Sequence, residues 1–500
     1  PQQPPQPPQP PQPPPLPPGL PPPPAPPCTV DMLKQRPAGD KSWPIACSHA
    51  TLGDANTELD LSGAHLSYGD FEEATFQGEG VIKMDGAGLA HADMSGSTVS
   101  AVGRKDQTID FSGANLTNAN LRSSKLTAES SYGGDSLIDF TGAELANADL
   151  SGTKFTTRLG SYDEDNAATI DFTEANLAHA DLSGATLKAD ADNKGYATID
   201  FTKANLALAD LSGSEFRADG YYTATIDFTE ANLAHADLSG SEALADGSGG
   251  ATDAIVDFKK ANLANADLSD ATFEAEGYYA TINLVEANLA HADLSGSELY
   301  AYTNYYDAMI DFTEANLANA DLSGSWLTAR SRSGDTTIDF AKTNLTNADL
   351  SGSKLTATFS RNSREEDAGV STIDFTEADL ANVSGSMLTT DNIIGLAYPP
   401  PPSQPPSSPS PPPPPPPSPS PPPPSPSPSP PPPSPPPPYP LGSRHVPVGE
   451  AAASPSPTKA PAVCGKRNHG GCKTPGLKEL NELYAVRLQR IHPIARLCAC

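Results

Sequence analysis

Carboxylate side chains recur at two fixed positions through the middle of the chain, where they could ligate a hard cation or act as acid and base. The first column is Asp110, Asp139, Asp171, Asp200, Asp227, Asp257, Asp311, Asp339 and Asp374. The second column is Asp149, Asp181, Asp210, Asp237, Asp267, Asp293, Asp321 and Asp349. We expect these side chains to cap turns and keep the protein soluble. A calcium ladder and a surface for a basic partner are the alternatives.

Catalysis is not expected from these carboxylates. Every pair is repeated along the chain, whereas an active site would break a repeat once. The sequence contains no G-x-x-x-x-G-K-[ST], H-E-x-x-H or G-x-S-x-G motif and no dinucleotide-binding fingerprint. His179, His235 and His291 share one column that elsewhere holds Asn147, Leu208 or Asn265, so we interpret them as surface variants. We therefore predict that the protein is not an enzyme and binds no cofactor. Binding of calcium is the alternative to the second prediction.

The cysteines flank this region instead of lying within it: Cys28, Cys47, Cys464, Cys472, Cys498 and Cys500. An even number around a cysteine-free centre is typical of disulfides that stabilise small terminal modules in an oxidising compartment. A zinc site with His469 or His492 is disfavoured, because Cys464 and Cys472 are eight positions apart whereas zinc knuckles use shorter gaps.

Tyrosines gather in the segments that interrupt the repeat. The candidates for docking a glycan or a polyproline helix are Tyr221, Tyr222, Tyr278, Tyr279, Tyr305 and Tyr306. The alternative is that these rings pack against one another.

The element that must position these residues is an internal repeat. Its unit reads T-I-D-F-T-E-A-N-L-A-H-A-D-L-S-G-S-E-L, with an apolar residue every five positions, as at Phe172, Leu177, Leu182 and Leu187. A period of five fits neither a helix nor a flat strand, but it fits a coil that turns a corner every five residues. Four sides close one turn, and about twelve units follow one another. An insert follows each unit. At one corner of every turn it would project from the coil as a loop or short hairpin, and the inserts of successive turns would stack into a fin.

The triplets Ala-Asn-Leu at 175–177 and Ala-Asp-Leu at 180–182 resemble the pentapeptide-repeat family, and the resemblance covers about 57–390. It implies an all-β fold, a right-handed quadrilateral β-helix. It implies little about function, since one fold hosts many roles.

Proline-rich arms flank the repeat on both sides, and the chain has 56 prolines in 500 residues. Proline lacks an amide donor and fixes φ, so these arms are expected to adopt extended polyproline II. The Ser-Pro runs resemble hydroxyproline-rich glycoproteins of plant and algal walls, which implies hydroxylated prolines with O-linked sugars. The candidate O-glycosylation sites are Ser410, Pro411, Pro412, Pro413, Pro414, Ser418, Pro421, Pro422, Pro431 and Pro435. N-glycosylation sequons begin at Asn115, Asn344 and Asn382.

These features divide the chain into five parts. They are a Pro/Gln-rich arm (1–27), a cysteine-containing cap (28–56), the solenoid (57–397), a Pro/Ser-rich arm (398–461) and a basic cysteine-containing module with a short helix (462–500). No apolar run of about 18 residues is present, so no membrane insertion is expected. The start at Pro1 fits a processed product or a fragment.

Charge is distributed unevenly between these parts. Residues 51–398 carry a net charge of −37 and residues 399–500 a net charge of +6. A basic C-terminal part attached to an acidic rod favours head-to-tail contact between copies, which builds a filament when it does not close. We therefore predict a secreted structural glycoprotein of a cell wall, cell surface or ciliary surface. It would assemble with itself and with glycans as partners, and not with nucleic acid. The alternatives are an extracellular carbohydrate-binding module and, less favoured, an acidic mimic of DNA.

Overall fold

The computed structural model of the chain describes residues 28–38, 44–160, 166–191, 195–247, 253–359 and 369–385, together with the backbone of 393–394. All of them lie in the first of two compact units, Pro1–Ser408. Both predicted arms, the module at 462–500, the last four cysteines and the O-glycosylation candidates lie outside the described residues. Within the described part, no helix is long and apolar enough to cross a membrane.

Two long sheets, in which every strand pair is parallel, dominate the fold. The odd-numbered sheet contains β1 (Thr51–Leu52), β3 (Thr75–Gly78), β5 (Thr98–Gly103), β7 (Lys125–Ser130), β9 (Lys154–Leu159), β11 (Thr186–Ala191), β13 (Glu215–Gly220), β15 (Glu242–Asp246), β17 (Thr272–Gly277), β19 (Glu298–Thr303), β21 (Trp326–Ser331) and β23 (Lys354–Phe359). The even-numbered sheet contains β2 (Leu59–Asp60), β4 (Val81–Lys83), β6 (Gln107–Asp110), β8 (Ser136–Asp139), β10 (Asn166–Asp171), β12 (Gly195–Asp200), β14 (Thr223–Asp227), β16 (Asp253–Asp257), β18 (Tyr279–Asn283), β20 (Ala308–Asp311), β22 (Thr336–Asp339), β24 (Ser371–Asp374) and β25 (Ile393–Ile394).

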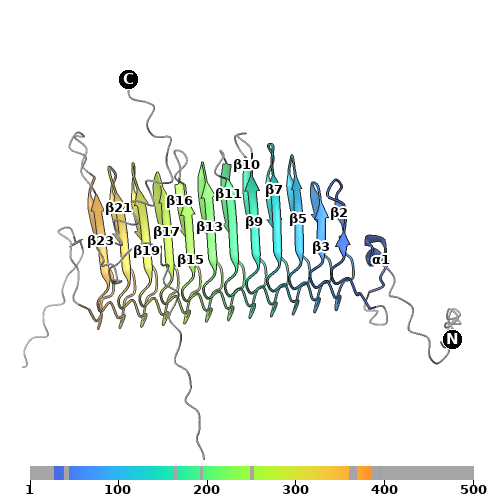
Figure 1. Cartoon of the computed structure of the whole chain (residues 1–500). Coiled ribbons are helices and arrows are strands. Elements are labelled where there is room, and N and C mark those ends of the chain that lie inside the picture. The colour runs from blue at the N-terminus through green and yellow to red at the C-terminus, as the bar shows by residue number, and fades with distance from the viewer. Residues whose placement is uncertain are drawn as a thin grey trace, which may run out of the picture. The chain divides into compact units, whose positions relative to one another are not determined.

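Each turn of the chain contributes one strand to each sheet and two isolated bridges between them. In one turn, Asn176 bridges to Asn205 and Asp181 to Asp210, and β11 and β12 then follow. Figure 1 shows the bridged segments as a coil from which the paired strands stand up side by side. The 12 strands of the odd-numbered sheet agree to within one with the predicted number of turns. The predicted all-β solenoid is confirmed.

The inserts depart from the prediction of a loop or short hairpin at one corner. The insert at 218–222 is mostly strand, because β13 continues to Gly220 and β14 begins at Thr223. Extension in this form is favourable, since pairing with the neighbouring turns satisfies the backbone N–H and C=O groups. The stacked fin is therefore built from the upper parts of both sheets, and we call it the blade.

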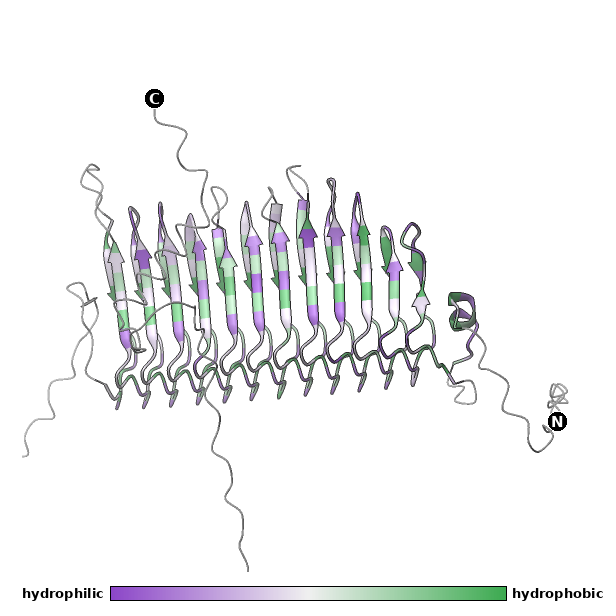
Figure 2. Ribbon diagram, viewed as in Figure 1, coloured by the Kyte–Doolittle hydropathy of each residue, from purple (hydrophilic) through white to green (hydrophobic). Residues whose placement is uncertain are grey.

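Alternation of side chains explains why the blade folds as two strands per turn. In β11, Leu187 and Ala189 are buried while Lys188 faces outward. In β12, Ala197 and Ile199 are buried in the same way. This period of two is that of a strand with one face on a core. Figure 2 shows the resulting bands of hydrophilic and hydrophobic residues along the strands.

The predicted apolar column forms the centre of the coil. Its phenylalanines are buried and stack face to face with ring centroids 4.8–5.0 Å apart, in the runs Phe111, Phe140, Phe172, Phe201, Phe228, Phe258 and Phe312, Phe340, Phe375. Leu284 occupies the same column between the two runs. The ring separation follows the spacing of paired strands, about 4.7–4.9 Å, so the ladder and the core repeat together.

Three tight corners per turn require left-handed backbone. In one turn they are Glu174, His179 and Gly184, with φ of 57°, 59° and 60°. Non-glycine residues reach this region at a cost of about 1–2 kcal/mol. A Cβ at Gly184 would meet no atom within 4 Å, so glycine there serves conformation and not space. The predicted histidine column occupies these exposed corners, with His235 and His291 in equivalent positions.

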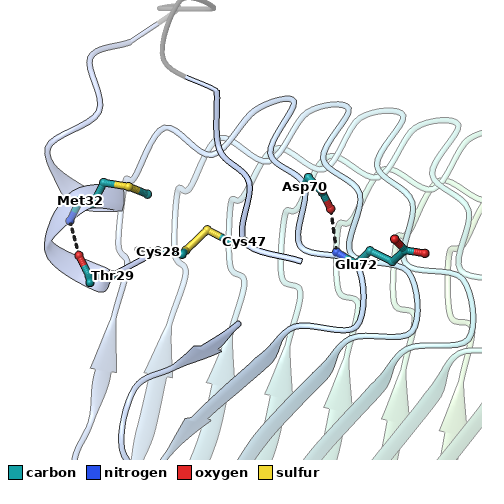
Figure 3. The surroundings of a disulfide bond; sticks show 6 residues. All are labelled: Cys28, Thr29, Met32, Cys47, Asp70 and Glu72. Carbon is teal, nitrogen blue, oxygen red and sulfur yellow. Dashed lines mark hydrogen bonds between the residues drawn. A yellow bond between two sulfur atoms is a disulfide. The ribbon is translucent and has the colours of Figure 1, made fainter. Parts of the chain in front are cut away.

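A short cap covers the N-terminal end of the solenoid. Helix α1 (Val30–Lys34) is capped by Thr29, whose side chain accepts a hydrogen bond from the Met32 amide, and Leu33 is buried. A disulfide joins Cys28 to Cys47 and so holds the helix against the first turns (Figure 3). Arg36 donates from Nη1 to the carbonyl oxygens of His65 and Ser67, each at 2.8 Å. The cap thereby occupies carbonyls that the first turns would otherwise leave open.

Candidate functional site

The first aspartate column caps turns. The Oδ1 atom of Asp171 accepts a hydrogen bond from the amide of Thr173 at 2.7 Å, and Asp110, Asp139, Asp200, Asp227, Asp257, Asp311, Asp339 and Asp374 accept from the residue two places on in the same way. This geometry is that of an Asx-turn. The turn-capping interpretation is therefore confirmed for this column.

The second aspartate column makes the same bond to an amide, and from Asp149 to Asp267 it also accepts a hydrogen bond from a serine hydroxyl. Asp181 accepts from the Ser183 amide at 2.9 Å and from the Ser183 hydroxyl at 2.6 Å. Asp210 and Ser212 repeat both contacts one turn later. The serine after each Ala-Asp-Leu triplet thus belongs to the cap.

Burial and like charge act on several carboxyls of the first column. Burial raises the pKa of Asp200, and the charges of Asp171 and Asp227 in the adjacent turns add to the rise, while hydrogen bonds from Thr202 oppose it. The pKa values of Asp257 and Asp339 are raised for the same main reason. Amide donors therefore offset part of the repulsion expected between stacked carboxylates. Among the described residues, no group of three or more His, Cys, Asp or Glu side chains is placed to hold a metal ion, and the calcium alternative stays an untested expectation.

An asparagine ladder runs between the two aspartate columns, and the sequence reasoning missed it. From Asn205 onward, each amide Nδ2 donates to the Oδ1 of the asparagine in the preceding turn at 2.9–3.0 Å, and the ladder contains Asn176, Asn205, Asn232, Asn262, Asn288, Asn316 and Asn344. Stacked amides of this kind stabilise in-register parallel strands. The signal was available, because the same repeat position holds asparagine in every one of these turns.

Charged side chains form a network on the outer face of the odd-numbered sheet. The side chain of Asp219 in β13 is only 4% exposed. It is paired with Arg217 Nε at 2.8 Å and with Lys188 Nζ at 3.1 Å. Asp190 in β11 lies 3.5 Å from Lys188 Nζ and 3.4 Å from Arg158 Nε. Buried carboxylates here are compensated by cations on the same face, as burial of charge requires.

The next two strands continue this network with an excess of carboxylates. Asp246 in β15 pairs in register with Glu276 in β17, and Glu274 lies on the same strand. Burial, together with the nearby charges of Asp246 and Glu274, raises the pKa of Glu276 to about 7. Burial also raises the pKa of Glu274. These three groups form the acidic cluster of the blade, and sequence periodicity gave no sign of them because they occupy insert positions.

The six candidate tyrosines come together in two groups at the free edge of the blade. Tyr278 stacks on Tyr305 with centroids 4.4 Å apart, and Tyr279 stacks on Tyr306 with centroids 4.7 Å apart. The other group packs edge to face, with Tyr221 and Tyr222 at 5.2 Å and 87°. Tyr196 joins this second group, 5.6 Å from Tyr222. The tyrosine rings at this edge thus pack against one another, as the alternative interpretation of the sequence predicted.

Comparison with known proteins bears on the repeat. The family model described as pentapeptide repeats matches residues 109–128 and 169–188, with eight copies. These residues form the bridged coil and the strands that leave it. The solenoid is a pentapeptide-repeat solenoid.

Two solved structures to which the chain is similar share little sequence with it. HetL, a pentapeptide repeat protein involved in heterocyst differentiation regulation from the cyanobacterium Nostoc, is 18% identical over 69% of this chain and 90% of its own, with a TM-score of 0.21. QnrB1, a plasmid-mediated fluoroquinolone resistance protein, is 16% identical in a trypsin-treated form over 52% of this chain and 91% of its own, with a TM-score of 0.22. No curated protein matches the chain.

The three predicted N-glycosylation asparagines occupy different environments on the pentapeptide-repeat solenoid. The Asn344 amide donates to Asn316 and the Asn382 amide donates to Asn347, each at 3.0 Å. Asn115 follows Gly88 in its column, so the preceding turn offers its amide no side-chain acceptor. Of the three, Asn344 belongs to the asparagine ladder, Asn382 bonds to an asparagine of a different column, and Asn115 has no asparagine before it in its own column. Glycosylation at any of them stays a prediction.

Proposed function

We propose that this protein is a non-catalytic structural rod of an extracellular assembly, in which the Pro/Ser-rich arm carries O-linked sugars and copies join into a fibre or matrix. The observation that carries the proposal is the repeated use of polar side chains within the rod. Aspartates cap their own turns and asparagines bond to the next turn, over most of its length. Such ladders contribute stiffness and regularity, the properties of a structural element.

The N-terminal cap supports an extracellular location. The Cys28–Cys47 disulfide closes a loop across the end of the solenoid, and disulfides persist mainly in oxidising compartments. The Pro/Ser-rich sequence at 398–461 supports the glycosylated arm by its resemblance to wall glycoproteins.

The cap also bears on how copies would assemble. Leu33 and Arg36 cover the first turns of the solenoid. Direct stacking of one solenoid onto the N-terminal end of another would have to displace them. We therefore favour assembly through charge, with the basic C-terminal part of one copy meeting the acidic rod of another, and not through continuation of the sheets.

Electron microscopy of the full chain as a function of salt tests this function. Filaments at low ionic strength that dissolve at high salt are expected, because screening weakens contacts between opposite charges. Mass spectrometry of a peptide from 399–440 should find hydroxyproline bearing pentose or hexose. Dispersed monomers at all salt concentrations, together with unmodified proline, would contradict the proposal.

Carbohydrate binding by the tyrosine edge is the second candidate, favoured by the exposure of Tyr279, Tyr305 and Tyr306, each 43–54%. Stacking within the pairs leaves only their outer ring faces for a sugar, which limits the platform to short contacts. Retention on immobilised wall polysaccharide should be lost in Tyr279→Ala and kept in Tyr132→Ala, a change at an exposed tyrosine elsewhere. Equal retention of both variants would remove this candidate. Mimicry of DNA is less favoured, since the blade interrupts a duplex-like surface.

A further inference from the structure

The stacked tyrosines of the blade edge are held in place by their backbone as well as by their rings. The Thr303 hydroxyl, which is fully buried, donates to the carbonyl oxygen of Tyr278 at 2.6 Å. The same oxygen atom of Thr303 accepts from the amides of Tyr305 and Tyr306 at 3.1 and 3.2 Å. The Tyr306 amide also donates to the Tyr278 carbonyl at 3.2 Å. One threonine therefore fixes the connection after β19 against the connection after β17.

The rings consequently lie face to face across two adjacent turns. The planes of Tyr278 and Tyr305 are 17° apart, and those of Tyr279 and Tyr306 are 10° apart. Three of these four side chains are 43–54% exposed, so a diffusible oxidant can reach them. Two nearly parallel phenols at the separation of stacked rings present ring carbons to each other with little need to move.

We propose that Tyr278 with Tyr305, and Tyr279 with Tyr306, are sites of oxidative coupling to dityrosine, with hydrogen peroxide acting through a haem peroxidase as the oxidant. Each phenol loses one electron and its hydroxyl proton and becomes a phenoxyl radical. The two radicals combine through a new bond between ortho carbons, and each ring then moves its ortho hydrogen to oxygen and becomes a phenol again. The two electrons and two protons reduce one peroxide molecule to two water molecules.

The product would be a covalent staple between the turn of β17 and β18 and the turn of β19 and β20. It would reinforce the blade near the acidic cluster, where Asp246, Glu274 and Glu276 repel one another. The inference depends on the stacked geometry alone, so it holds or fails independently of the extracellular assembly proposed above.

Peroxidase treatment of the dilute full chain, followed by proteolysis and mass spectrometry, tests the coupling. We expect a cross-linked peptide pair joining 278–279 to 305–306, short of two hydrogen atoms, and dityrosine fluorescence that does not depend on protein concentration. A variant with Tyr305→Phe and Tyr306→Phe keeps the stacked rings but removes one phenol of each pair, so it should lose this peptide pair and the fluorescence that comes from it.

Tyr132→Phe is the matched control. Tyr132 is 75% exposed, more than any of the four, and Arg104 rather than a tyrosine lies over its ring. Its removal should leave the cross-link unchanged. Absence of a cross-link between 278–279 and 305–306 in treated wild type would overturn the proposal, as would a cross-link between these segments that persists in the double variant. A yield that rises with protein concentration would also overturn it, because the coupling would then join different copies.

Discussion

Replacement of Glu276 by glutamine should stabilise the protein above neutral pH and have little effect in mild acid. Burial on the outer face of β17 raises the pKa of this carboxyl from 4.5 to about 7, with Asp246 and Glu274 adding to the rise. In the unfolded chain the group ionises near its ordinary value. Folding therefore favours the protonated form, and ionisation of Glu276 opposes folding once the pH exceeds the unfolded pKa.

The magnitude follows from the size of the shift. Each pKa unit corresponds to about 1.4 kcal/mol, so the shift of Glu276 corresponds to about 3 kcal/mol as an upper value. The cost begins near pH 4.5, grows as the pH rises towards 7 and is constant above that. Since the neighbouring carboxyls share the protonation, we expect Glu276→Gln to raise the free energy of unfolding by about 2 kcal/mol at pH 8.

Urea unfolding followed by circular dichroism at pH 5 and pH 8 measures this difference. The matched control is Glu174→Gln, a change at an exposed glutamate on a corner of the coil, far in sequence from the acidic cluster. It should alter the free energy of unfolding little and equally at both pH values. A Glu276→Gln effect that is the same at pH 5 and pH 8, or that destabilises at pH 8, would refute the electrostatic reasoning.

Three further predictions concern the core, the asparagine ladder and the cap. Each is tested by measuring the free energy of unfolding. Phe201→Ala should cost about 3–5 kcal/mol, because the ring is fully buried between two stacked rings; Phe201→Leu should cost clearly less, and equal costs would argue against a role for ring volume. Asn232→Ala removes two ladder hydrogen bonds, each worth about 1 kcal/mol, whereas Asn344→Ala removes one; equal losses would speak against the ladder. Reduction of the Cys28–Cys47 disulfide, which spans 19 residues, should lower stability by about 3 kcal/mol, and an unchanged unfolding midpoint under reducing conditions would contradict the stabilising role of the cap.

Much of the fold could be read from a single turn of sequence. Phe172, Leu177, Leu182 and Leu187 are apolar at intervals of five, and all are buried as that spacing predicts. The period identifies the coil because only a chain that turns a corner every five residues brings such a set to one interior. The recurrence of aspartate at two fixed positions of the repeat was likewise enough to expect turn caps.

The inserts could not be read in the same way. Their lengths and compositions differ from turn to turn, so no period marks Ala218–Gly220 as strand or Tyr221 and Tyr222 as the connection. Parallel pairing with neighbouring turns decides their conformation, since it is the neighbours that supply hydrogen-bond partners and the opposite sheet that buries alternate side chains. The prediction of a loop or hairpin at this corner was wrong because it was made for each turn by itself, without its neighbours.

The candidate sites also differ in whether the sequence or the tertiary structure reveals them. The sequence by itself determined the type of solenoid, the columns of the coil and the presence of tyrosines in the inserts, because these depend on contacts that repeat within one unit. Only the tertiary structure decided that Tyr279 stacks on Tyr306 and that burial raises the pKa of Glu276 to about 7. Those properties depend on contacts between adjacent turns, which lie about 4.8 Å apart. The side chains that meet there are separated by some thirty residues along the chain.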